Sequence, residues 1–123
     1  MSPESKVIAV TLPALRKFAL SLPETTEQPH FQFGSWRVHG KIFATLPPGD
    51  AHIHLFVAEP EREEALGMYP EFIEKLFWGG KVVGLRIAIG AAPAALLKRL
   101  VQQAWANKAP KAMLSEARGD AAQ

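Results

Sequence analysis

The chain has 123 residues, which is the size of one domain, and its lack of cysteine excludes disulfide bonds and thiolate zinc sites. Hydrophobic residues make up 48% of the chain and charged residues 21%, as in globular proteins and unlike disordered ones. The net charge is only +2, which is too small by itself to indicate a nucleic-acid partner.

We expect a soluble, cytoplasmic protein that has no membrane partner. The first 13 residues lack the basic start and the apolar run of a signal peptide. No apolar stretch approaches the roughly 20 residues that a membrane-spanning helix needs. The absence of cysteine also agrees with a reducing compartment.

The N-terminal half predicts one helix followed by three strands. Apolar residues at helical spacing indicate a helix over residues 12–22, with Thr11 as its N-cap and Pro23 at its end. The PETTEQP segment that follows indicates a loop between two prolines. The predicted strands cover residues 35–38, 41–46 and 52–58. The PPGD segment is a strong turn signal between the last two strands.

The C-terminal half predicts two helices and one further strand. An acidic helix begins near Pro60, and the EFIEKLFWGG segment after it is ambiguous between a helical turn and an extended connector. Residues 82–89 indicate a strand, and residues 93–108 form the clearest helix of the sequence. The apolar stripe of this helix consists of Leu96, Leu97, Leu100, Val101, Ala104 and Trp105. No internal repeat is evident.

The order of these elements, α-β-β-β-α-β-α, predicts an α+β fold with two layers. Adjacent strands with helices at both ends favour an antiparallel sheet of about four to five strands, with the helices packed on one face. We expect residues 1–123 to form a single domain in which residues 110–123 are a frayed tail. The second face of the sheet would then be free.

The turn between the first two strands decides which side chains lie on that free face. A two-residue turn would pair Val38 with Lys41, whereas a three-residue loop closed by a left-handed Gly40 would pair Arg37 with Lys41. The three-residue loop is favoured because it gathers apolar side chains on the core face. Those core residues are Trp36, Val38, Ile42, Ala44 and Leu46.

Side chains also alternate between the two faces of the sheet along the strands predicted over residues 52–58 and 82–89. The side chains expected to face inward are Ile53, Leu55, Val57, Val83, Leu85, Ile87 and Ile89. The side chains expected to face outward are Arg37, Lys41, Phe43, Thr45, His52, His54, Phe56 and Arg86. Nucleic-acid-binding proteins use such mixtures because cations neutralise phosphates while rings stack on bases. The alternative is a solvated sheet face whose two phenylalanines are covered or simply exposed.

Charge is distributed unevenly along the chain. Residues 59–74 hold half of the 12 acidic residues, and residues 75–111 hold only basic ones. This asymmetry can produce a directional field even though the total charge is small. The alternative is that the acid-free segment arises by chance and is solvated.

Catalytic and metal-binding alternatives have weaker support. His52 and His54 point the same way on a strand and could chelate one ion, but no third ligand has matching spacing. Ser35, His30 and Glu27 are the only nearby candidates for a catalytic triad, and the sequence lacks the motif of a hydrolase. The WGGK segment lacks the remainder of a phosphate-binding loop. We therefore expect no metal, no cofactor and no catalytic activity.

Four segments carry a resemblance to a known family. LPETTEQPHF, SWRVHGKIFATL, FWGGKVVGLRI and LLKRLVQQAWANKAPK resemble the MmcQ/YjbR family, over about residues 11–111. The most specific part is the Arg-Val-x-Gly-Lys-Ile-Phe-Ala run. Members often carry a tryptophan after the Gly-Gly-basic step, where this chain has Val82 and Val83.

The resemblance implies a small α+β protein with a double-wing DNA-binding motif. The candidate nucleic-acid-binding residues are then Arg37, His39, Lys41, Phe43, Lys81 and Arg86. The alternative function is a protein- or peptide-interaction module, because an open sheet face or edge strand can bind a peptide or a second copy in a homodimer. The layout is similar to that of secretion-chaperone-like domains, which is an analogy of fold alone.

Overall fold

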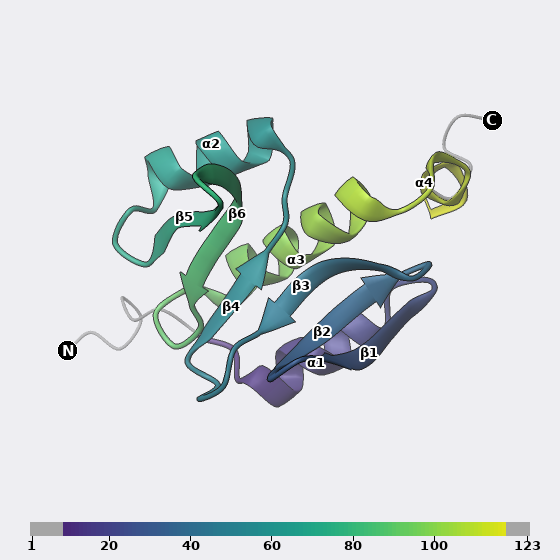
Figure 1. The fold of residues 1–123 in the computed structure, drawn as a ribbon, viewed down its shortest axis with the longest axis horizontal. Coiled ribbons are helices and arrows are strands. Elements are labelled where there is room, and N and C mark those ends of the chain that lie inside the picture. Colours follow the sequence, from purple (N-terminus) through teal and green to yellow (C-terminus); the bar gives the residue numbers. More distant parts are fainter. Residues whose placement is uncertain (1–8, 118–123) are drawn as a thin grey trace.

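A computed structural model describes residues 9–117 as one six-stranded antiparallel sheet with helices (Figure 1). The strand order is β1-β2-β3-β4-β6-β5. The elements in chain order are α1 (Leu12–Leu20), β1 (Thr25–His30), β2 (Phe33–Val38), β3 (Lys41–Leu46), β4 (His52–Leu55), α2 (Glu59–Met68), β5 (Ile73–Trp78), β6 (Lys81–Ala88), α3 (Ala94–Lys108) and α4 (Lys111–Ala117). The α+β class with an antiparallel sheet is therefore confirmed, and the sheet has six strands where about four to five were expected.

Helices α1 and α3 lie behind the face of the sheet that is turned away from the viewer in Figure 1, and α2 lies beside β5. Thr11 caps α1 as expected, because its hydroxyl oxygen accepts a hydrogen bond from the Ala14 N–H at 3.3 Å. All six residues of the predicted α3 stripe are buried. The Trp105 indole N–H donates to the Pro23 carbonyl oxygen at 3.0 Å, which ties α3 to the segment after α1.

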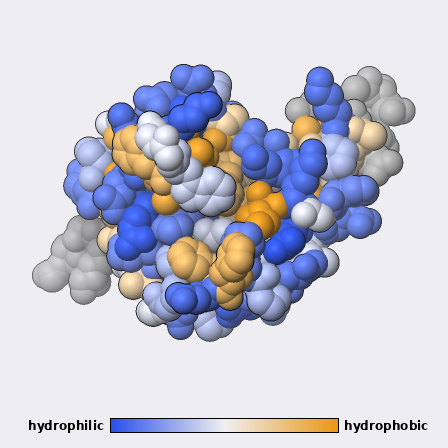
Figure 2. Space-filling view, in the orientation of Figure 1, coloured by the Kyte–Doolittle hydropathy of each residue, from blue (hydrophilic) through white to orange (hydrophobic). Residues whose placement is uncertain are grey.

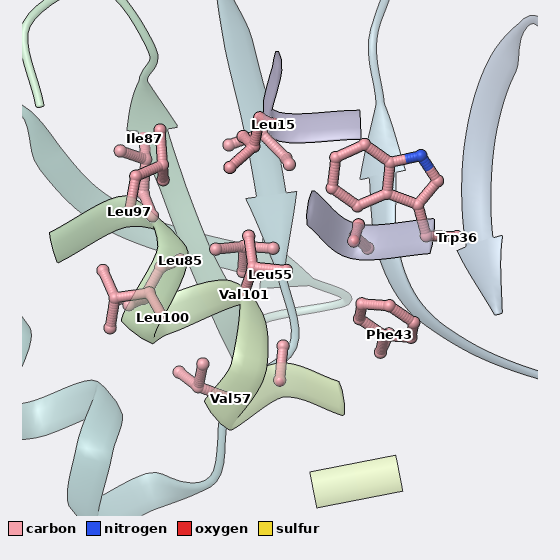
Figure 3. Close-up of a cluster of buried hydrophobic side chains, with 14 of the residues drawn as sticks. Leu15, Trp36, Phe43, Leu55, Val57, Leu85, Ile87, Leu97, Leu100 and Val101 are labelled. Atoms are coloured by element: carbon pink, nitrogen blue, oxygen red, sulfur yellow. The ribbon is translucent and has the colours of Figure 1, made fainter. Parts of the chain in front are cut away.

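The core lies between these two helices and the sheet (Figure 3). Leu15 of α1 and Val101 of α3 are fully buried against sheet residues such as Leu55. Trp36 and Phe43 lie side by side in Figure 3, with ring centroids 6.5 Å apart, and both are fully buried. Each such side chain contributes about 1.5–3 kcal/mol through burial.

The sheet has six strands because two segments without a clear strand pattern form its edges. The predicted PETTEQP loop is instead strand β1, and the ambiguous EFIEKLFWGG segment contains β5. Most residues of both strands are exposed, so neither segment carries a continuous apolar pattern. An edge strand tolerates Pro29 because one row of its backbone groups needs no partner strand.

The turn after β2 differs from the favoured three-residue loop. Val38 pairs with Lys41 across a two-residue turn, in which His39 has φ 53° and Gly40 has φ 85°. Two left-handed residues define the tight turn whose twist matches antiparallel strands, and histidine enters this conformation more readily than most side chains. The expectation that Gly40 closes a three-residue loop was therefore wrong.

A β-bulge in β3 explains why Phe43 does not face outward. Trp36 pairs with Ala44 and Arg37 pairs with Ile42, so Phe43 is an additional residue on β3. One additional residue shifts the alternation of side chains by one position. Phe43 therefore turns into the core and Ile42 turns to the open face, which reverses both expectations.

The β5–β6 hairpin has the same turn length and the same bulge position. Trp78 pairs with Lys81 across Gly79 and Gly80, both left-handed. The register then shifts so that Val83 is the additional residue. Val83 lies on the open face rather than in the core, whereas the other six predicted inward residues are buried. The two hairpins thus form a structural repeat that the sequence did not reveal.

The C-terminal segment is helical where a frayed tail was expected. Residues 111–117 form α4, and the partly buried Met113 and Leu114 pack against the core. Residues 1–8 and 118–123 lie outside the described part of the chain. The expectation of a frayed tail over residues 118–123 therefore also lies outside the described residues. Within residues 9–117, no helix combines the length and the apolar character needed to cross a membrane.

Candidate functional site

The open face carries a groove between the two hairpins. Strands β3 and β6 are both antiparallel to β4, so they run in the same direction and begin at the same end of the sheet. The tip of the β2–β3 hairpin and the tip of the β5–β6 hairpin therefore flank the end of β4. Figure 2 shows a hollow with apolar surface at the centre of this face, surrounded by hydrophilic surface.

We define the central groove as two adjoining hollows of about 520 and 390 Å³, which share His30, Thr45, Phe56 and Trp78. Its aromatic residues are Phe31, Phe33, Phe56 and Trp78. Its aliphatic residues are Ile42, Leu76 and Val83. Its cations are Arg37, Lys41 and Lys108, and no aspartate or glutamate is among the described residues that line it. Such a surface matches a ligand with negative charge and flat apolar groups.

The β2–β3 hairpin and α3 supply the cations of the groove. Arg37 is half-buried, and its Nε–H donates to the Ser35 hydroxyl oxygen at 3.1 Å while Nη2 donates to the Pro29 carbonyl oxygen at 3.4 Å. These bonds fix the guanidinium group above β1 and β2. Lys41 is exposed at the start of β3, and Lys108 reaches the groove from the last turn of α3. Asn107 next to it donates to the Phe56 carbonyl oxygen at 2.8 Å, which holds α3 against the end of β4.

Aromatic rings line both hollows: Phe56 and Trp78 border the two of them, and Phe31 and Phe33 border the second. Phe56 is almost fully buried beneath Trp78, with ring centroids 5.7 Å apart. Phe33 lies near the His54 ring, with a centroid distance of 6.1 Å. Phe31 is 93% exposed at the β1–β2 turn and has φ 59°.

Below the groove, a row of polar side chains crosses the middle strands. The His54 Nε2 atom accepts a hydrogen bond from Arg86 Nη1 at 2.9 Å, because a guanidinium group has only donors. His54 Nδ1 therefore carries the ring proton and donates it to the Thr45 hydroxyl oxygen at 3.2 Å. Arg86 also lies 3.3 Å from a carboxylate oxygen of Glu74.

His54 is held in its neutral form. Burial is the main cause that lowers the pKa of His54 below its ordinary value, and the charges of Arg86 and His52 lower it further, while Glu74 opposes them. A neutral imidazole can accept the Arg86 hydrogen bond, whereas an imidazolium cannot.

The structure brings only two of the six predicted nucleic-acid-binding residues to the groove. Arg37 and Lys41 line the groove, and His39 and Lys81 are exposed at or beside the hairpin tips, outside its lining. Arg86 is engaged in the polar row. Phe43 belongs to the core, so it faces away from any ligand on the open face. Sequence reasoning placed Phe56, Thr45 and His54 on the open face, as observed.

Among the groove residues that sequence reasoning missed, four carry a phenylalanine or tryptophan ring or a positive charge. These are Phe31, Phe33, Trp78 and Lys108. The exposed Phe31 lies in the turn after β1, a strand whose residues were predicted as a loop. Lys108 is far from the other groove residues in the sequence. A GGK step directly after Trp78 was the one available signal, because it indicated a hairpin tip.

The alternative catalytic residues are engaged in structural hydrogen bonds. The Ser35 hydroxyl donates to the Gln28 carbonyl oxygen at 2.7 Å, and the Glu27 carboxylate binds Arg16 at 2.7 Å and the Trp36 indole N–H at 3.1 Å. Both ring nitrogens of His54 have protein partners. Across residues 9–117 there is no group of three or more histidine, aspartate or glutamate side chains placed to hold a metal ion.

A family model described as YjbR matches residues 20–107, which includes both hairpins, the sheet and nearly all of α3. A search of curated proteins finds no match to this chain.

Proposed function

The chain belongs to the YjbR family, and from this membership and the geometry of its two hairpins we propose that it binds DNA. The observation that carries the proposal is the pairing of the hairpins at one end of the sheet. In each hairpin a turn glycine is followed by the lysine that begins the second strand. Lys41 and Lys81 therefore occupy equivalent positions beside the two tips. We call these two hairpins, β2–β3 and β5–β6, the wings.

The charges near the wings support a phosphate-binding role. Arg37 and Lys108 add two cations to the groove between the wings, and no carboxylate lines that groove within the described residues. Cations that contact phosphates release counterions, and this release supplies most of the sequence-independent affinity for DNA. The acidic helix α2 lies beside β5, outside the groove lining.

Fluorescence anisotropy of labelled DNA at several salt concentrations tests the proposal. Contact with about four phosphates predicts a log–log slope of about −3.6 for affinity against salt. The double variant Lys41→Ala plus Lys81→Ala should reduce this slope to about −1.8, because two phosphate contacts are lost. Arg37 is left intact because its hydrogen bonds hold β2 to β1.

The matched control removes the same charge from the other face. Lys17 and Lys98 are exposed on α1 and α3, outside the groove lining, so Lys17→Ala plus Lys98→Ala should leave the slope near its original value. Equal losses in both double variants, or no DNA binding at low salt, would contradict the proposal.

A protein or peptide partner is the second candidate. The β5 edge is open within the described sheet, and Phe77 and Trp78 are exposed on it. An exposed strand edge can add a further strand from a peptide or a second copy of the chain. Such binding should respond little to salt, which separates it from DNA binding.

A further inference from the structure

The aromatic side chains of the central groove have features that phosphate binding does not require. Phe31 is 93% exposed and Trp78 is 60% exposed, although burial of either ring would favour folding. Both rings border the hollow whose floor includes Phe56. A ligand that contacts only phosphates gains nothing from these rings.

Phe31 is also unfavourable for the backbone of its turn. His30 pairs with Phe33, so Phe31 and Gln32 form a two-residue turn, and Phe31 takes φ 59° in the left-handed region. A bulky side chain rarely adopts this conformation, and glycine adopts it freely. A residue that is both strained and exposed, without a role in the core, indicates a contact with a ligand.

We propose that the central groove binds unpaired bases of a single-stranded nucleic acid, with Phe31 and Trp78 as stacking rings and Arg37, Lys41 and Lys108 as phosphate ligands. This inference rests on the proposed function and adds the form of the nucleic acid. In a duplex the base faces are stacked on one another, so only base edges and phosphates are accessible to a protein. In a single strand the base faces can stack on aromatic side chains.

The charge and size of the groove fit this occupant. Cations and rings line the first hollow together and further rings line the second, with no carboxylate among the described lining residues, so a chain of alternating phosphates and flat bases is complementary to both. Hollows of about 520 and 390 Å³ lie within the roughly 300–1,000 Å³ typical of ligand sites. In the polar row, both ring nitrogens of His54 are already bonded, but the Thr45 hydroxyl accepts from His54 and keeps its own proton to donate to a base edge.

Anisotropy with labelled oligo(dT), oligo(U) and a duplex of equal length tests the inference in the full chain. Oligo(dT) or oligo(U) should bind more tightly than the duplex, and a comparison of the two shows whether the ribose hydroxyl matters. Phe31→Gly should weaken single-strand binding about 5- to 150-fold, which is the loss expected for one stacked base. Duplex binding should not change.

Phe31→Gly cannot lose binding through misfolding of the turn, because glycine relieves the left-handed strain and should keep or raise the melting temperature. Trp78→Ala is a second variant with the same expected direction. Phe77→Ala is the matched control, since Phe77 is exposed on the same strand but does not line the groove. It should bind single strands like the unmodified protein.

The possible failures are distinguishable. Salt-dependent duplex binding that equals or exceeds single-strand binding would overturn the inference and leave the proposed DNA binding intact. Single-strand binding that survives both Phe31→Gly and Trp78→Ala would overturn the stacking role. Binding of neither nucleic acid at low salt would overturn the proposed function and this inference together, and salt-insensitive capture of a peptide would then favour the protein-interaction alternative.

Discussion

At the residue scale, single positions decide how the sheet closes around its core. Gly84 is buried on β6, where the backbone of β4 passes closely beside it. An added Cβ atom there would overlap the Leu55 carbonyl oxygen, which belongs to the backbone and cannot turn away. This position is therefore glycine for lack of space and not for a turn.

Gly84→Ala is expected to lower the free energy of unfolding by about 2 to 3 kcal/mol, because the strands must separate to admit the methyl group. Gly67→Ala is the control, since Gly67 lies in α2 with open space around it. That change should raise the free energy of unfolding by about 0.5–1 kcal/mol. Urea denaturation of both variants measures the difference, and similar values for the two would contradict the close approach at Gly84.

The neutral His54 predicts a pH-dependent stability. The pKa of His54 in the folded state lies below its ordinary value. Between these two pKa values the unfolded chain therefore binds a proton at His54 and the folded chain does not. The free energy of unfolding should fall as pH decreases through the ordinary histidine value and level off below the folded-state pKa. His54→Gln should remove this component of the pH dependence.

Urea denaturation between pH 7.5 and pH 5 measures this component as the difference between the unmodified protein and His54→Gln. His39→Asn is the control, because His39 is exposed and asparagine tolerates its left-handed conformation. The control should retain the pH dependence of the unmodified protein. An identical pH dependence in His54→Gln would contradict a neutral, buried His54.

At the element scale, helices and central strands were predicted well from the sequence. The observed α1, α3 and β3 agree with their predicted segments because capping residues, prolines and apolar spacing are local signals. Strand β4 and the part of β6 after its bulge kept their predicted faces, as the burial of Ile53 and Leu85 shows, whereas Val83 did not. The edge strands β1 and β5 were missed because their stability depends on a neighbouring strand and not on their own apolar pattern.

The bulge in β3 could not be located from the sequence either. Ile42 and Phe43 are both apolar, so either one satisfies the core pattern, and the choice depends on where the extra residue lies. The structure places Phe43 beside Trp36 and Ile42 in the groove. The same ambiguity applies to Val82 and Val83 in the other hairpin, which is why the repeated geometry is clear only in three dimensions.

At the scale of the whole molecule, the three tryptophans report on the two faces of the sheet. Trp36 and Trp105 are buried between the sheet and the helices, and Trp78 is 60% exposed beside the groove. Iodide should therefore quench the emission of one tryptophan out of three.

Trp78→Phe is expected to abolish this quenchable fraction and to leave the remaining emission shielded, because Trp36 and Trp105 stay in the core. Steady-state fluorescence with increasing iodide measures both quantities. The conservative change keeps a ring beside Phe56, so the groove should keep its shape. Strong quenching in the variant would mean that one of the two core tryptophans is accessible.

Signals in the sequence were enough to predict the α+β class, helices α1 and α3, the family resemblance, and the inward side chains of β4 and β6 apart from Val83. Apart from the resemblance, these properties depend on the spacing of apolar residues, which repeats about every 2 residues in a strand and about every 3.6 residues in a helix. Only the tertiary structure decided that Phe43 is a core residue and that Phe31, Trp78 and Lys108 meet at one groove. The position of Phe43 depends on the bulge in β3, and the position of Trp78 depends on the strand order β4-β6-β5. Both features follow from packing between segments that are distant in the chain.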